Sequence, residues 1–106
     1  LTQDINNVRS QAVRFKLKEI IKLKFGVEHV DAAEFIINHE SGFNPQAVNK
    51  SSGACGVVQA LPCEKLPCEL SFRGAECQLK WFADYISNRY GNPLNAQEFW
   101  RTNKWY

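Results

Sequence analysis

Residues 31–45 read Asp-Ala-Ala-Glu-Phe-Ile-Ile-Asn-His-Glu-Ser-Gly-Phe-Asn-Pro, and this stretch predicts the centre of the fold. Asp31 and Glu34 have the spacing of a capping box, and the apolar run after them predicts a helix that begins at Asp31. Gly42 and Asn44-Pro45 end that helix, because the residue before a proline leaves the helical region. Glu40 therefore stands near the C-terminal end of the helix.

The following stretch, residues 46–60, predicts extended or turned chain. It contains the run Ser52-Gly53-Ala54-Cys55-Gly56-Val57-Val58-Gln59. Ser51-Ser52-Gly53 is a turn signal, and Val57-Val58 favours a strand. Two short extended pieces around that turn can form a small hairpin beside the helix of Glu40.

Helices are expected on both sides of this centre. An N-terminal helical segment occupies residues 1–26. Its apolar residues have helical spacing, first on one face (Ile5, Val8, Ala12, Phe15) and then on a shifted one (Ile20, Ile21, Leu23, Phe25). The shift predicts a break or bend near residues 14–18. Residues 61–75 predict a short helix or loop, residues 77–90 a strong helix capped by Gly91, and a last helix holds Leu94, Ala96, Phe99 and Trp100.

Length and composition fit one mainly α domain over residues 1–106, with a small extended part of α+β character. Apolar residues make up 44% of the chain, which is enough for a core, but no run is long enough for a transmembrane helix. The chain has no initiator Met and no signal-like segment, so we expect a mature form or an excised domain.

The cysteines are Cys55, Cys63, Cys68 and Cys77. An even number in a short chain predicts two disulfides and an oxidising compartment. The alternative is a zinc site, whose ligands usually come in tight pairs that these spacings lack, so no metal is expected. Three pairings of the cysteines are possible, and the sequence does not choose among them.

Residues 1–25 carry six bases and two acids, although the whole chain has a net charge of only +2. Such a basic stretch can attract an anionic polymer such as nucleic acid or a bacterial wall. The alternative is a solvated helix face, which we favour because the bases interleave with apolar residues. No nucleic-acid partner is therefore expected.

Glu40 is the candidate for chemistry. Flanking Ile36, Ile37 and Phe43 can keep water from its carboxyl group, which raises the pKa and lets the group hold a proton near neutrality, as the acid of a glycosidase must. The alternative is an exposed glutamate at a helix end. His39 can tune the charge of Glu40 or be a surface or packing residue.

The run Glu40-Ser41-Gly42-Phe43-Asn44-Pro45, followed by the run at residues 52–59, resembles the paired motif of soluble lytic transglycosylases and goose-type lysozymes. In those families, Glu-Ser-x-aromatic-Asn-Pro precedes Gly-Ala-x-Gly-Leu-Met-Gln. Residues 77–91 resemble small cysteine-bearing members of the same lysozyme-like superfamily. The resemblance covers about residues 31–106 and implies a lysozyme-like fold.

The resemblance also implies roles for individual residues. Glu40 matches the catalytic acid and Gln59 a glutamine of the sugar groove, with Ser52 on the adjoining turn and Val58 on the groove wall. Several aromatic residues can stack on sugar or pack in the core: Trp81, Tyr85, Tyr90, Trp100, Trp105 and Tyr106. Of these, Tyr90 and Trp100 are the predicted sugar contacts. Val57-Val58 replaces the usual Leu-Met, Cys55 fills the variable position, and the Ala-Tyr-Asn-Ala-Gly-like segment of many members is missing.

The function implied is cleavage of the β-1,4 bond between N-acetylmuramic acid and N-acetylglucosamine in bacterial peptidoglycan. A single glutamate acts as acid and base, without a cofactor, and gives a 1,6-anhydro product. A hydrolytic muramidase, a non-catalytic peptidoglycan-binding module and an adhesion module of the same fold are the alternatives. We expect a monomer that is secreted, wall-associated or periplasmic, of bacterial or phage origin.

Overall fold

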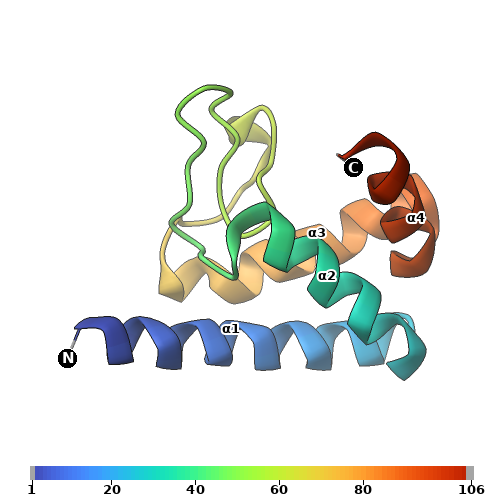
Figure 1. The fold of residues 1–106 in the computed structure, drawn as a ribbon, viewed down its shortest axis with the longest axis horizontal. Coiled ribbons are helices and arrows are strands. Elements are labelled where there is room, and N and C mark those ends of the chain that lie inside the picture. Colours follow the sequence, from blue (N-terminus) through green and yellow to red (C-terminus); the bar gives the residue numbers. More distant parts are fainter. Residues whose placement is uncertain (1, 105–106) are drawn as a thin grey trace.

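A computed structural model describes residues 2–104. Its α-helices are α1 (Thr2–Lys24), α2 (Val30–Ser41), α3 (Ala75–Tyr90) and α4 (Pro93–Asn103), joined by 3₁₀ turns at Val27–His29, Cys63–Lys65 and Phe72–Gly74. Figure 1 shows α1 along one side, α2 and α3 packed over it, α4 at one end, and the irregular chain after α2 projecting away from α1. This arrangement confirms the mainly α class.

Helix α1 runs without interruption from Thr2 to Lys24 and is straight in Figure 1, so the predicted break or bend near residues 14–18 is wrong. Val13, Leu17 and Ile21 recur every four residues and are fully buried against α2 and α3. The other apolar set, which includes Ile5, Val8 and Phe15, is exposed. The shift of face in the sequence therefore reflects two faces of one straight helix, of which only one meets the core.

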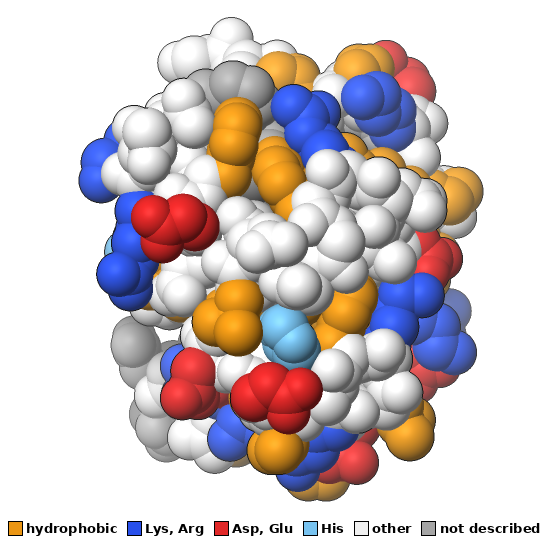
Figure 2. Space-filling view, turned by 90° about the vertical axis from the view of Figure 1, so that its right-hand side faces the viewer, with side chains coloured by type: hydrophobic (Ala, Val, Ile, Leu, Met, Phe, Trp, Pro, Cys, Tyr) orange, Lys and Arg blue, Asp and Glu red, His pale blue; other side chains and the backbone are white. Residues whose placement is uncertain are grey.

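The core is formed by apolar side chains from all four helices. Its largest fully buried members include Leu17 and Ile21 from α1, Ile36 and Ile37 from α2, and Leu79, Phe82 and Ile86 from α3; the small Ala96 of α4 is also fully buried. The face at one end of the molecule carries separate apolar patches with charged side chains between them, as Figure 2 shows. No helix of residues 2–104 is long and apolar enough to cross a membrane.

The start of α2 differs from the prediction and its end agrees. A 3₁₀ turn leads into the helix and places Asp31 inside its first turn, so the predicted capping box does not form. Glu34 instead pairs with Arg14, at 3.4 Å, and with Lys18. At the other end Gly42 adopts the left-handed conformation, with φ of 63°, and its N–H donates to the Asn38 carbonyl.

The chain between α2 and Cys63 reverses direction twice without forming a strand. Isolated antiparallel bridges join Val48 to Cys55 and Cys55 to Ala60. The first reversal occurs around residues 51–53, as predicted, and the second at residues 56–59. Val57-Val58 therefore lies in a buried turn and not in a strand, because the Gly56 N–H donates to Ala47 and the chain folds back at once.

Two disulfides fix this irregular region, which confirms the predicted number and determines the pairing. Cys55 is bonded to Cys63, and Cys68 to Cys77. The first bond ties the 56–59 turn to the 3₁₀ turn that follows it. The second ties the loop before α3 to the first turn of α3. Each bond joins neighbouring cysteines along the chain and closes a short loop.

Candidate functional site

Glu40 lies in the last turn of α2, two residues before Gly42, and is partly buried. Burial of its carboxyl group raises the pKa above the ordinary value of 4.5, while the neighbouring Trp100 N–H and the His39 ring oppose the rise. The protonated form of Glu40 is thus favoured relative to a carboxyl group in water.

Trp100 of α4 packs against α2 beside Glu40. Its ring meets Phe35 edge to face, with centroids 5.3 Å apart, and lies 4.8 Å from the His39 ring. The indole nitrogen is buried and makes no hydrogen bond of ordinary length within the described residues, although it is close enough to lower the pKa of Glu40. The predicted sugar-contacting residue Trp100 is therefore also a packing residue of the α2–α4 interface.

Ser41 joins the end of α2 to the 56–59 turn. Its hydroxyl donates to the Val57 carbonyl oxygen at 2.7 Å and accepts from the Asn44 N–H at 3.3 Å. The residue after it in the motif, Phe43, is buried with φ of 65°, a left-handed conformation that non-glycine residues adopt rarely. The local structure of the Glu-Ser-Gly-Phe-Asn-Pro run thus holds the helix end against the turn.

Gln59 closes the turn and is itself left-handed, with φ of 56°. Its side-chain nitrogen donates to the carbonyl oxygens of Ala47, at 3.2 Å, and Gly56, at 2.9 Å. Its side-chain oxygen has no hydrogen-bond partner among residues 5–104 and can accept a bond from a ligand. Gln59, the predicted groove residue, therefore uses its side-chain nitrogen to stabilise the 56–59 turn and to hold it against the chain at Ala47.

A shallow pocket lies beside Gln59, between this turn and α3. Its lining includes Val58, Gln59 and Lys65 together with Trp81 and Tyr85, whose rings are stacked with centroids 5.3 Å apart. Val58 lines this pocket and is almost completely buried. Among the described residues, the aromatic side chains that line this pocket are Trp81 and Tyr85.

The other predicted contacts lie elsewhere. Tyr90 packs against Phe99 and Tyr85, and its hydroxyl is buried without a hydrogen-bond partner in the described part of the chain. Burial is the main cause that raises the pKa of Tyr90. Ser52 is exposed on the first reversal, where its hydroxyl accepts from the Ala54 N–H. Trp105 and Tyr106 are outside the described residues.

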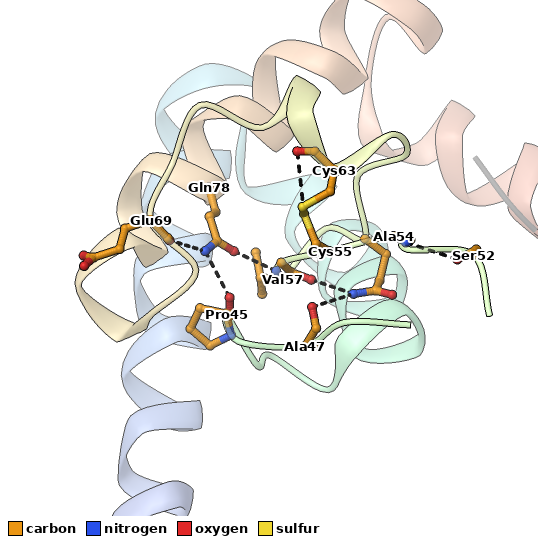
Figure 3. The surroundings of a disulfide bond; sticks show 11 residues. Pro45, Ala47, Ser52, Ala54, Cys55, Val57, Cys63, Glu69 and Gln78 are labelled. Carbon is orange, nitrogen blue, oxygen red and sulfur yellow. Dashed lines mark hydrogen bonds between the residues drawn. A yellow bond between two sulfur atoms is a disulfide. The ribbon is translucent and has the colours of Figure 1, made fainter. Parts of the chain in front are cut away.

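Gln78 is a residue whose role the sequence did not indicate. It is fully buried on α3, where its side-chain oxygen accepts from the Val57 N–H at 2.7 Å. Its side-chain nitrogen donates to the carbonyl oxygens of Pro45 and Glu69 at 3.1 and 2.8 Å. Figure 3 shows this amide between the three segments. The only sequence signal was a polar residue on the apolar face of a helix.

Gly56 explains why the 56–59 turn can approach Gln78 so closely. Its φ of 81° is left-handed, and a Cβ atom at this position would lie 2.8 Å from the Gln78 oxygen and 2.7 Å from a Leu66 methyl group. Any larger residue would push the turn away from α3. The glycine of the second motif is therefore required by both backbone conformation and space.

Comparison with known proteins identifies one family. Residues 20–76, just over half of the chain, match the family described as Transglycosylase SLT domain. The matched stretch contains Glu40, Gln59 and the Cys55–Cys63 disulfide, and ends at the start of α3. The same comparisons found no matching curated protein and no matching solved structure.

Proposed function

The chain belongs to the transglycosylase SLT domain family, and we propose from this that it cleaves the β-1,4 bond between N-acetylmuramic acid and N-acetylglucosamine in peptidoglycan, with Glu40 as the acid and base. The observation that carries the proposal is the partly buried Glu40 carboxyl at the end of α2, whose pKa is raised by burial. A carboxyl group in such surroundings keeps a proton closer to neutrality and can donate it to a glycosidic oxygen.

In the proposed reaction, Glu40 gives one proton to the substrate and takes one proton back from it. Glu40 protonates the bridging oxygen, the bond from that oxygen to C1 of the muramic acid breaks, and positive charge develops at C1. The N-acetyl oxygen of the same sugar stabilises this centre. The sugar's own 6-hydroxyl oxygen then bonds to C1 and returns its proton to the Glu40 carboxylate, which leaves a 1,6-anhydro ring without addition of water.

The proposed reaction uses a single carboxyl group of the protein. Paired-carboxylate glycosidases hold their two groups about 5–9.5 Å apart. The sequence motifs single out Glu40 alone among the carboxylates. We propose that the N-acetyl group of the substrate takes the place of a second carboxylate.

The glycan would lie along the end of α2 and the 56–59 turn. The Ser41–Val57 hydrogen bond keeps these two segments together. The free oxygen of the Gln59 amide and the exposed hydroxyl of Ser52 would then bind sugar hydroxyls, and the stacked Trp81 and Tyr85 rings would offer an apolar surface to a sugar face.

Mass spectrometry of peptidoglycan fragments tests the proposal. Wild-type protein should release 1,6-anhydro muropeptides, which are lighter by one water than hydrolytic products, and Glu40→Gln should release none. Products heavier by one water would identify a hydrolytic muramidase. Glycan binding with no release of fragments would identify a non-catalytic wall-binding module, and neither binding nor release would leave only an adhesion role for the fold.

This function places the protein where peptidoglycan is found. The two disulfides of the structure form and persist in oxidising compartments, which the cytosol is not. We therefore propose a periplasmic or secreted location in a bacterium, or delivery to the wall by a phage.

A further inference from the structure

A polar groove follows α1 where this helix meets the loop at residues 43–46. Two adjoining hollows form it, and both are lined by Ser10 and Phe43. Along α1 the lining extends from Asn6 to Arg14, which corresponds to about 12 Å at the rise of an α-helix. The groove is therefore long enough to hold several residues of an extended chain.

The groove is rich in amides and positively charged. Its lining includes six side-chain amides, and Arg9 and Arg14 contribute two guanidinium groups; the amides are those of Asn6, Asn7, Gln11, Asn38, Asn44 and Gln46. Among residues 5–104, no Asp or Glu lines either hollow. Amides donate and accept hydrogen bonds, whereas the two arginines add specificity for anions.

Both guanidinium groups are held over aromatic rings. That of Arg9 lies 5.6 Å from the centroid of Phe72, and that of Arg14 lies 4.8 Å from the centroid of Phe43. Arg14 contacts Glu34 through Nε, at 3.4 Å. This pre-ordered arrangement suits the bidentate binding of carboxylates.

The groove lies on the opposite side of α2 from Glu40. Asn38 faces the groove, and Glu40 follows it by two residues, a rotation of about 200° around an α-helix. Glu34, on the side of Asn38, pairs with α1, whereas Glu40 lies beside Trp100 of α4. Figure 1 shows α1 and α4 at different sides of α2. The groove is thus separate from the proposed glycan site.

We propose that this groove is a second binding site, which takes an extended peptide with free carboxylates. The carboxylates pair with Arg9 and Arg14, and the peptide's backbone N–H and C=O groups pair with the side-chain amides of Asn7, Gln11 and Asn38. If the proposed function holds, the natural source of such a ligand is the acidic peptide that peptidoglycan carries, so that the groove would hold the peptide on one side while Glu40 acts on the glycan.

The composition of the groove favours a peptide over two other polymers. A neutral glycan would leave both guanidinium groups without a partner of opposite charge. A nucleic acid presents a phosphate every few ångströms and is bound by many basic side chains. This groove has two arginines, and one of them, Arg14, is already in contact with Glu34. Two separated charges among amides match a peptide with two carboxylates.

A titration followed by NMR tests the proposal. The ¹⁵N-labelled protein is titrated with the N-acetylated pentapeptide Ala-Glu-Lys-Ala-Ala, which carries two carboxylates and one ammonium group, and with a carboxylate-free control that has Gln for Glu and an amidated C-terminus. We expect the peptide with carboxylates to shift the side-chain amide signals of Asn6, Asn7, Gln11 and Asn38, and to bind at least about fivefold more tightly than the carboxylate-free control.

Charge-matched variants complete the test. Arg9→Gln should weaken binding of the peptide with carboxylates about fivefold, and Lys50→Gln, which removes an exposed charge that lines neither hollow, should leave it unchanged. Equal affinity for both peptides, shifts confined to residues near Gln59, or tighter binding of chitotetraose or an oligonucleotide in the groove would overturn the proposal. Because the titration requires no cleavage, its result is independent of the activity of Glu40.

Discussion

The Ser41 hydroxyl donates a 2.7 Å hydrogen bond to the Val57 carbonyl oxygen, across 16 residues of chain. The donor follows Glu40 directly, and the acceptor lies in the turn that ends at Gln59. The two sequence motifs therefore meet through this bond. A change that moves the turn is expected to alter the position of the end of α2, and with it the environment of the proposed acid.

Gln59 both braces the turn and borders the pocket, and substitutions can separate these roles. Gln59→Ala removes the two bonds to Ala47 and Gly56 and should lower the free energy of unfolding by about 1–2 kcal/mol. Gln59→Gly should be the more stable of the two variants, because φ of 56° suits glycine. We expect both to turn over glycan more slowly at 25 °C while still folded, as circular dichroism would verify. Wild-type turnover in both would limit Gln59 to bracing.

Gln78 should be among the most sensitive polar positions of the fold. Gln78→Leu keeps the size of the side chain but leaves the Val57 N–H and the carbonyls of Pro45 and Glu69 without their partner, so we expect a loss above about 3 kcal/mol in urea denaturation. Asn88→Ala, an exposed change on the same helix, is the control and should cost less than about 0.5 kcal/mol. Comparable stability of the two variants would contradict this role.

The sequence was sufficient to predict where the helices lie and that Glu40 stands near the end of α2, because apolar spacing, the C-terminal glycines and Pro45 act locally. It did not predict that α1 is continuous, because Ile5, Val8 and Phe15 have helical spacing as regular as that of Val13, Leu17 and Ile21. Periodicity shows that a helix has apolar faces, but only tertiary packing decides which face is buried. The same limit explains the strand predicted at Val57-Val58, where Gly56 and Gln78 impose a turn.

The candidate site was predictable to a similar extent. Glu40 and Gln59 follow from the paired motif, whereas the environment of Glu40 depends on Trp100, which is 60 residues further along the chain. The buried role of Gln78 could not be predicted, because a glutamine in an amphipathic helix usually lies on the exposed face. The pairing of the cysteines could not be predicted either, since the geometry of the loops and not the spacing in the sequence brings each pair together.

The two disulfides should differ in their effect on activity. In the chain-entropy model, loops closed over 8 and 9 residues contribute about 2.5 kcal/mol each. The double variants Cys55→Ser/Cys63→Ser and Cys68→Ser/Cys77→Ser should therefore lose similar stability in thermal melts. Only the first frees the turn of Gln59, so we expect a greater loss of glycan cleavage in the first. Intact mass of the wild type should be four hydrogens below the reduced value, and four free thiols would contradict both bonds.

The ionised carboxylate of Glu40 should lower the stability of the folded protein at neutral pH. Because its pKa is higher in the folded chain than the ordinary 4.5, folding is penalised as pH rises through the interval between the two values. Glu40→Gln should therefore melt at a higher temperature than the wild type at pH 7 and at the same temperature at pH 3. Glu76, whose pKa is lowered by Lys80 and Lys16, is the control of opposite sign, and Glu76→Gln should be less stable than the wild type at pH 7. A neutral-pH melting temperature of Glu40→Gln below that of the wild type would refute the effect of burial.

Trp100 should set the pH at which Glu40 loses its proton. The indole N–H opposes the rise in the Glu40 pKa, so Trp100→Phe, which retains the ring contacts with Phe35 and His39, should raise that pKa further. Glycan cleavage needs the protonated acid, and the rate falls as pH rises past its pKa. The alkaline limb of the kcat/KM profile should therefore move to higher pH in Trp100→Phe. If Trp100 acted only by stacking on sugar, this substitution would raise KM and leave the limb where it is, so the direction of the shift distinguishes the two roles.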